Sequence, residues 1–221
     1  MAYTIFQKID KWFNPYKYSN EGMLALEMQQ NPRKRNKGRT AQEMVDNKEL
    51  LGVNFLPQKQ SFNITEAIQK LQELPFDNAL YYHDLDVHIL ATKYDTNSSK
   101  RYQARSQKQR RKLKKNLLIY PRDVDIFDMT HIQAVGFHGI EDREEMLVGW
   151  NSRQNQQDMR IFEEGISFIN STQPIIWYTI IEFQNKTDYS AIWNTKIISL
   201  DGEILTEKSF HDTSNSVSYT H

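Results

Sequence analysis

The spacing of apolar residues changes along the chain from a helical period to a strand period, which predicts a mixed α+β fold. Between residues 61 and 74, apolar residues recur at three- and four-residue steps and predict a helix with one apolar face. Asn63 or Thr65 can cap the start of this helix, and Pro75 ends it. We expect its apolar face to pack on a sheet.

Strand-forming runs follow this helix and dominate the C-terminal part of the chain. They are rich in β-branched and aromatic residues, and Asp201-Gly202 supplies a two-residue turn between the last two runs. The predicted strands are two within 79–93, one at 117–120 and three at 175–183, 191–200 and 203–210.

A second helix is predicted between the strands, over residues 155–170. Met159, Phe162 and Ile166 lie on its apolar face. Together these elements predict an α+β fold with a central antiparallel sheet and flanking helices.

The pattern predicts one folded domain between two less regular ends. We expect the domain to span residues 61–212, after an irregular or partly helical lead segment of residues 1–60 and before a polar tail of residues 213–221. No apolar run approaches the roughly 20 residues that a membrane-spanning helix needs. Charged residues interrupt the apolar start of the chain, so no secretory signal is predicted and the expected location is cytoplasmic.

Charge is balanced over the whole chain but very uneven along it. Lys and Arg number 28, as do Asp and Glu, so the net charge indicates no partner. Between Lys100 and Arg122, however, ten residues are basic and none is acidic. This segment predicts phosphate contacts with a nucleic acid, although a solvated loop or an exposed helix has the same composition. The residues assigned to nucleic-acid binding are Lys100, Arg101, Arg105, Lys108, Arg110, Arg111, Lys112, Lys114 and Lys115.

The chain contains no cysteine, which excludes disulfides, thiolate metal sites and cysteine nucleophiles. It also lacks the Gly-rich phosphate-binding loops and the GxSxG motif. Nucleotide-binding and serine-hydrolase functions therefore have no support.

Residues 128–163 carry the candidate chemistry, because they place an imidazole, an amide oxygen and a carboxylate in order. His131 can act as a general base, although a single histidine is also common as a structural residue. Asn155 can turn its side-chain oxygen toward a hard cation such as Mg²⁺, or it can cap a helix, and Asn151 has the same two options. Glu163 would lie about 12 Å beyond Asn155 along an unbroken α-helix, so we expect it to hold a metal-bound water or to be a solvated carboxylate.

These residues resemble those of the DNA/RNA non-specific endonucleases, the ββα-metal or His-Me finger nucleases, and most of all the DNA-entry nucleases. In that family a DRGH motif holds the general-base histidine. A later pattern, L-x-x-x-T-x-x-x-N-x-x-x-M-x-x-F-E, supplies an asparagine as the sole protein ligand of Mg²⁺. The corresponding residues in this chain are DMTH at 128–131, and then Leu147, Asn151, Asn155, Met159, Phe162 and Glu163.

The resemblance implies a ββα-metal finger within the α+β domain. It implies a metal-dependent endonuclease that hydrolyses DNA, RNA or both with little sequence preference. His131 would be the general base, and Asn155 would be the ligand of Mg²⁺ or of another hard divalent cation such as Mn²⁺. The oligomeric state and the choice between DNA and RNA stay open.

Two residues beside His131 depart from the family pattern, since Met129 replaces an Arg and Thr130 replaces a Gly. An Arg can hold a phosphate through two hydrogen bonds, which Met cannot do. The arginines that could substitute are Arg122, Arg143, Arg153 and Arg160, and we assign the catalytic role to Arg153 and Arg160 because they are nearest to the expected metal helix.

If no arginine takes this role, the alternative function is a nuclease-like protein that binds nucleic acid and cleaves it weakly. A third option is a non-enzymatic protein whose aromatic N-terminus recruits a partner. An active cytoplasmic nuclease would endanger its own cell. We therefore also expect a restraint, such as an inhibitor protein, masking by residues 1–60 or a narrow substrate.

Two further histidine motifs lie outside this pattern. His83 and His88 flank two aspartates in the sequence HDLDVH. On one uninterrupted strand the two histidines would face opposite sides, so a joint metal site would require a bulge or a turn, and otherwise both are structural. His138, in a predicted loop, is a second candidate for the base.

Overall fold

The structure is a computed structural model and describes residues 52–84, 86–100, 127–139, 146–151, 154–185 and 190–212. Its strands are β1 (Asn54–Pro57), β2 (Asn78–His83), β3 (Val87–Tyr94), β4 (Phe127–His131), β5 (Leu147–Asn151), β6 (Ile175–Asn185), β7 (Ser190–Ile198) and β8 (Ile204–Asp212). Its helices are α4 (Ile64–Glu73), η2 (Ser98–Lys100), α6 (Val135–His138), η5 (Asn155–Met159) and α8 (Arg160–Asn170).

Six of the strands form one sheet in the order β1-β2-β3-β6-β7-β8. Neighbouring strands are antiparallel except β1 and β2, which run parallel. The predicted α+β class is therefore confirmed, but the sheet is mixed rather than antiparallel throughout. The exception arises because α4 lies between β1 and β2 in the chain. This helix carries the chain back to the end of the sheet where β1 began, so β2 runs in the same direction as β1. β1 also belongs to the segment 1–60, so the sheet begins before residue 61.

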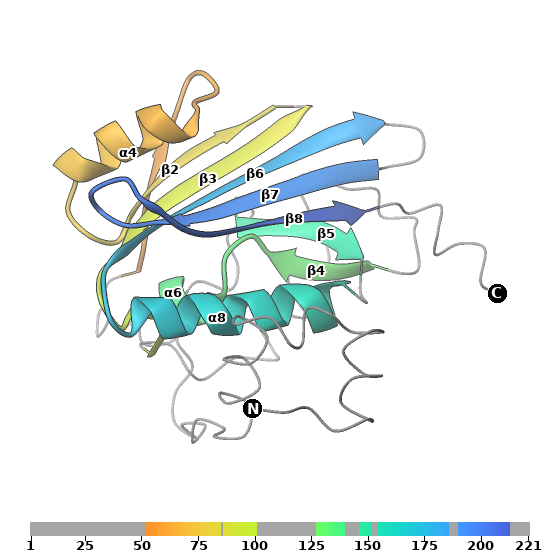
Figure 1. Ribbon diagram of the computed structural model, residues 1–221. Coiled ribbons are helices and arrows are strands. Elements are labelled where there is room, and N and C mark those ends of the chain that lie inside the picture. Colours follow the sequence, from red (N-terminus) through yellow and green to blue (C-terminus); the bar gives the residue numbers. More distant parts are fainter. Residues whose placement is uncertain are drawn as a thin grey trace, which may run out of the picture.

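The two faces of this sheet carry different elements (Figure 1). On one face lies α4, and on the opposite face lie the antiparallel pair β4–β5 and the helices α6 and α8. The molecule thus has three layers, with the sheet in the middle. The elements that carry His131, Asn155 and Glu163 all lie in the layer opposite α4.

The helix predicted over residues 61–74 is α4, and its start is capped as the sequence indicates. The side-chain oxygen of Asn63 accepts a hydrogen bond from the main-chain N–H of Glu66 at 3.0 Å. In return, the carboxylate of Glu66 accepts one from the main-chain N–H of Asn63 at 2.9 Å. This reciprocal pair is a capping box, which explains why the helix begins at this point in the chain.

The smaller of the two apolar cores lies between α4 and the sheet, as predicted for that helix. Ala67 and Leu71 of α4 are fully buried there. Tyr178 of β6 lies in the same core, and its hydroxyl donates a hydrogen bond to the main-chain oxygen of Phe62. Burial, with a smaller contribution from the negative charge of Glu182, raises the pKa of Tyr178 to about 12.

The larger core lies on the opposite face of the sheet and holds the β4–β5 pair and α8 in place. Trp150 of β5 packs edge to face on Trp193 of β7, with ring centres 5.2 Å apart. Phe162 of α8 packs in the same way on Phe210 of β8, at 6.1 Å. Aromatic pairs of this kind add to the free energy of burial, so both elements are firmly docked on the sheet.

The C-terminal strands agree with the sequence pattern. The predicted strands at 175–183, 191–200 and 203–210 correspond to β6, β7 and β8, which are consecutive neighbours in the sheet. Gly202 in the last turn has φ of 96°, a conformation that favours glycine, and Ser199 donates a hydrogen bond to the Asp201 carboxylate beside it.

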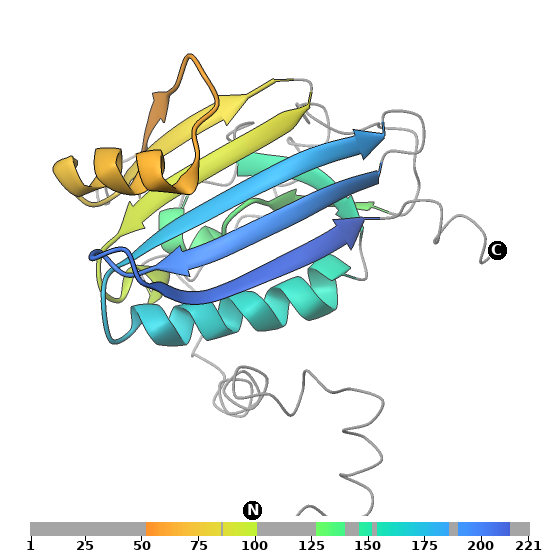
Figure 2. The same ribbon diagram turned by 45° about the horizontal axis from the view of Figure 1, so that its top comes forward.

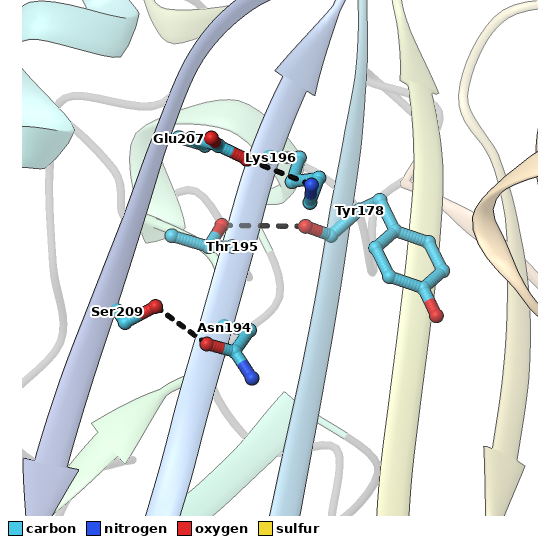
Figure 3. Close-up of polar contacts among 6 residues, drawn as sticks. All are labelled: Tyr178, Asn194, Thr195, Lys196, Glu207 and Ser209. Atoms are coloured by element: carbon cyan, nitrogen blue, oxygen red, sulfur yellow. Dashed lines mark hydrogen bonds and ion pairs between the residues drawn. The ribbon is translucent and has the colours of Figure 1, made fainter.

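The α4 face of the sheet is uncovered over β7 and β8 (Figure 2). A shallow groove of about 630 Å³ lies on it, lined by Ile180, Asn194, Thr195, Lys196, Glu207, Lys208 and Ser209. Figure 3 shows that polar groups of the groove bind one another: Lys196 pairs with Glu207 at 2.7 Å, and Ser209 donates to Asn194 at 2.6 Å. These contacts are cross-strand pairs that stabilise an exposed sheet face.

Several predictions concern residues outside the described part of the chain. These are the strand at 117–120, the tail at 213–221, most of the lead segment and nearly all of the basic run. Among the described residues, no helix is both long enough and apolar enough to cross a membrane.

Candidate active site on β4, β5 and the helix that follows

His131 is the last residue of β4 and lies opposite Leu147 of β5 in the antiparallel pairing. The apolar residues before and after His131 predict a strand that delivers it to an edge or a turn, and the chain does bend directly after β4. Residue His131 is 9% exposed, and the preceding Thr130 is 3% exposed. Both residues are therefore buried in the protein.

A second imidazole lies beside that of His131. The ring of His138 is 5.7 Å from the ring of His131, measured between centres and with a tilt of 36°. His138 ends α6, a single helical turn where the sequence predicted a loop, and Gly139 terminates this turn with φ of 69°. The structure thus brings together the first and the second candidate for the general base.

A buried hydrogen-bond network holds the ring of His138. Its Nε2 lies 2.9 Å from the main-chain oxygen of Gln133. Since a carbonyl oxygen can only accept, Nε2 is the donor and carries a proton. The side chain of Gln133 in turn accepts a hydrogen bond from the Tyr94 hydroxyl at 2.7 Å and donates one to the main-chain oxygen of Trp177 at 2.9 Å. This network joins the His131 turn to β3 and β6 of the large sheet.

Sequence reasoning missed Gln133 and Tyr94. Neither belongs to a motif, and they lie 39 residues apart in the chain. The signal that could have singled out Gln133 is its position as a polar residue between Ile132 and Val135, in a stretch that is otherwise apolar. Complete burial of such an amide requires partners for both of its ends.

Asn151 and Asn155 have different surroundings at the start of the helix. The side-chain oxygen of Asn151 accepts a hydrogen bond from the main-chain N–H of Gln154 at 3.1 Å. An asparagine that caps a helix makes a bond of this kind, which was one of the two options open to Asn151 from the sequence. Asn155 lies one residue beyond Gln154, inside the helix, and its side chain is half-buried.

The helix begins with a π-helical segment, η5, which runs without a break into α8. The helix predicted over residues 155–170 is confirmed, but its first five residues are π-helical rather than α-helical. The separation calculated for Asn155 and Glu163 on an ideal α-helix does not apply to them. Hydrogen bonds between residues five positions apart widen the helix at Asn155. Such π-helical segments are rare in proteins, and those that occur are often found at functional sites.

Gln154 attaches the start of this helix to the large sheet. Its side-chain oxygen accepts a hydrogen bond from the indole nitrogen of Trp150 at 3.0 Å, and its side-chain nitrogen donates to the main-chain oxygen of His211 in β8. One amide thus connects β5, η5 and β8. Gln154 belongs to no motif in the sequence, so this attachment could not be predicted from it.

Glu163 and Arg160 lie on α8. Glu163 is half-buried, and the side chain of Arg160 is 66% exposed. The Nε of Arg160 donates a hydrogen bond to Glu164 at 3.3 Å, in an ion pair one helical turn apart. Arg160 is therefore engaged on the helix surface. Arg153 and the side chains of Asp128 and Met129 lie outside the described residues.

The elements that carry the candidate residues follow one another in the chain as β4, α6, β5, η5 and α8. β4 with His131 pairs with β5, and η5 and α8 then run back beneath the pair (Figure 1). Within the part of the chain that the structure describes, no three or more His, Cys, Asp or Glu residues form a metal-binding group. Lys100 ends η2, and the other eight residues assigned to nucleic-acid binding are outside that part.

Comparison of the chain with protein-family models, curated proteins and solved structures finds no match. The function of the chain must therefore be inferred from the geometry of the site and from the residues within it.

Proposed function

We propose that this protein is a metal-dependent endonuclease that hydrolyses phosphodiester bonds of DNA, RNA or both with little sequence preference. The observation that supports it most is the succession of β4, β5 and the η5–α8 helix, with His131 at the end of the first strand and Asn155 at the start of the helix. This succession is the order of elements expected of a ββα-metal finger.

His131 is the proposed general base. In the reaction its imidazole accepts a proton from a water molecule, the water oxygen forms a bond to phosphorus, and the bond from phosphorus to the 3′ oxygen breaks. The orientation of the imidazole matters, because a base must lie within hydrogen-bond reach of the proton that it accepts. Packing against His138, whose own ring is held by Gln133, restricts the motion of His131.

Asn155 is the proposed ligand of a hard divalent cation, Mg²⁺ or Mn²⁺. The residues present are compatible with such an ion, because Asn151 accepts the bond from Gln154 and Mg²⁺ commonly binds through one or two protein oxygens while keeping several waters. A site with a single direct protein ligand also agrees with the lack of a larger group of acidic and histidine ligands among the described residues. When bound, the ion would offset negative charge on the phosphate as the new bond forms.

Glu163 is proposed to accept hydrogen bonds from water around Asn155, since both side chains are half-buried on one continuous helix. Arg160 is less suited to hold the phosphate than expected, because its Nε is bound to Glu164. Arg153 keeps the proposed phosphate-binding role, and the basic residues from Lys100 to Lys115 are proposed to contact the nucleic-acid backbone. An inhibitor protein is a further proposed partner.

The Arg160–Glu164 contact also supports the alternative function, a nuclease-like protein that binds nucleic acid and cleaves it weakly. In that case neither Met129 nor Arg160 would replace the phosphate-binding arginine of the family, and binding would persist without efficient cleavage.

Cleavage of supercoiled plasmid DNA and of RNA by the purified chain tests the proposal, with Mg²⁺ and with EDTA. We expect cleavage that requires the metal, and a loss of about 10²- to 10⁴-fold on His131→Ala, the range for removal of a general base. His211→Ala, an exposed histidine on β8, is the matched control and should cleave like the wild type.

The nuclease proposal would be disproved if the wild type and His131→Ala cleaved DNA and RNA at the same low rate, with or without the metal ion. If both proteins still retard DNA in a low-salt gel, the nucleic-acid-binding alternative stands. If neither retards DNA, both functions are excluded.

A further inference from the structure

The β2–β3 hairpin brings together the two histidines of the HDLDVH motif. The Asp84 carboxylate accepts hydrogen bonds from the main-chain N–H groups of Asp86 and Val87, both at 2.8 Å. The hydroxyl of Tyr82 donates to the other oxygen of Asp84 at 2.7 Å. These bonds stabilise a tight turn within the motif, so the turn that a joint site would require is present.

His83 and His88 are directly opposite each other across this hairpin. Opposite residues of antiparallel strands project from the same face of the sheet, so the two imidazoles are neighbours. Their ring centres are 5.6 Å apart, with a tilt of 39°. Tyr81 packs edge to face on His88 at 5.0 Å and fixes that ring from its other side.

The two histidines differ in how far they are buried. His88 is completely buried, whereas His83 is half-buried, so an ion can approach past His83. The Nδ1 atom of His83 is itself buried and has no hydrogen-bond partner among the described residues. Such an atom has lost its contact with water without a replacement, which is costly unless a ligand supplies one.

We propose that His83 and His88 form a two-imidazole site for a divalent transition-metal ion such as Zn²⁺, which would link β2 to β3. The spacing agrees with this assignment. With metal–nitrogen distances of about 2.0–2.1 Å, two imidazoles on one tetrahedral ion have ring centres roughly 5 Å apart. The observed 5.6 Å therefore requires only a small movement of the half-buried partner, His83.

The site selects ions by the chemistry of its ligands. Imidazole nitrogens suit Zn²⁺, Ni²⁺ and Cu²⁺, whereas Mg²⁺ and Ca²⁺ prefer oxygen. Water completes the coordination, because the described residues offer no third His, Cys, Asp or Glu ligand in a common group. The two histidines lie on β2 and β3, whereas Asn155 lies on η5, and the site does not depend on the proposed nuclease activity.

Titration calorimetry and thermal unfolding of the full chain with ZnCl₂, and with MgCl₂ as the comparison ion, test the proposal. We expect Zn²⁺ to bind and to raise the melting temperature with increasing concentration, because it binds the folded hairpin. Any effect of Mg²⁺ should be the same in the wild type and in a variant without His83, because Mg²⁺ is proposed to bind at Asn155. His83→Phe keeps an aromatic ring beside His88 but removes both nitrogens. It should weaken zinc binding at least tenfold, and melting without metal should show that the variant is folded.

Two further variants separate this site from the other histidines. His131→Ala removes the other pair of neighbouring imidazoles, His131 and His138. His211→Phe makes the same His-to-Phe change at an exposed position on β8. Both should keep the zinc affinity that depends on His83. The proposal is overturned if the wild type binds no zinc, if His83→Phe binds it as tightly as the wild type, or if His131→Ala abolishes binding instead.

Discussion

Asn151 and Asn155 show how position gives identical side chains different surroundings. They are four residues apart, yet Asn151 accepts a main-chain hydrogen bond as a cap does, while Asn155 lies within the π-helical segment that follows. A capping side chain acts on the stability of the helix, because it satisfies a main-chain N–H group that has no partner inside the helix. A metal ligand acts on catalysis.

Substitution of these two residues should therefore separate stability from activity. Asn151→Ala should lower the free energy of unfolding by about 1 kcal/mol, which corresponds to a decrease in melting temperature of about 2–4 °C. Asn155→Ala should lower Mg²⁺-dependent cleavage at least about tenfold with a smaller change in melting temperature. Calorimetric melting and plasmid cleavage measure both quantities. The assignment fails if the two variants exchange these effects.

The lowered pKa of His83 predicts a dependence of stability on pH. In the unfolded chain a histidine takes up its proton near pH 6.5, whereas burial makes the folded protein bind it less readily. Protonation therefore favours the unfolded state, and the contribution of neutral His83 is present above about pH 6.5 and lost as pH falls through that region. The pKa of Asp84 is lowered by its bond from Tyr82, so this carboxylate stays charged over the same range.

Urea unfolding of the wild type and of His83→Phe at pH 8 and pH 5 measures this effect. The wild type should lose stability relative to the variant on acidification, since the variant has no imidazole to protonate at this position. If the difference in free energy of unfolding between the wild type and His83→Phe were the same at pH 8 and pH 5, protonation of His83 would not be the cause.

At the scale of elements, the positions of helices and strands follow local sequence closely. The capping box of Asn63 and Glu66 and the strand pattern after residue 174 are interactions between near neighbours, so they can be predicted without the fold. The π-helical segment could not be predicted in this way. Its residues have an ordinary helical pattern, and the widened turn coincides with the point where Gln154 attaches the chain to β8.

Removal of the Gln154 side chain should loosen the attachment of this helix to the sheet. In Gln154→Ala the indole N–H of Trp150 loses its partner, at a cost on the order of 1–3 kcal/mol. Hydrogen exchange measured by mass spectrometry should become faster in β5 and at the end of β8. Gln157→Ala, an exposed position in η5, is the matched control and should exchange like the wild type. Equal exchange in both variants would show that Gln154 does not hold the helix.

At the scale of the whole molecule, charge is balanced overall while the basic residues cluster between Lys100 and Lys115. The net charge therefore provides no general attraction to nucleic acid, and binding must come from local contacts with phosphates. The described part of the chain provides the sheet and the candidate site, and the basic segment joins η2 to β4 in sequence.

The salt dependence of DNA binding tests the role of this segment. Replacement of Lys112, Lys114 and Lys115 by Gln should reduce the slope of log affinity against log salt by about 0.9 for each phosphate that these lysines no longer neutralise. Lys196→Gln, on the uncovered sheet face where Lys196 is paired with Glu207, is the control and should leave the slope unchanged. Fluorescence anisotropy with a labelled duplex measures both. An unchanged slope in the triple variant would exclude the segment as the binding element.

Sequence alone was sufficient for the α+β class, for α4 and its cap, for the C-terminal strands and for the placement of His131 at the end of a strand. These features depend on residues within a few positions of one another. The tertiary structure decided the parallel pairing of β1, the network from Tyr94 through Gln133 to His138, and the meeting of His83 with His88 across a turn. The pairing and the network depend on contacts between separate segments of the chain. The meeting of the histidines depends on whether residues 83–88 form a turn or a continuous strand. The spacing of apolar residues carries no information about either.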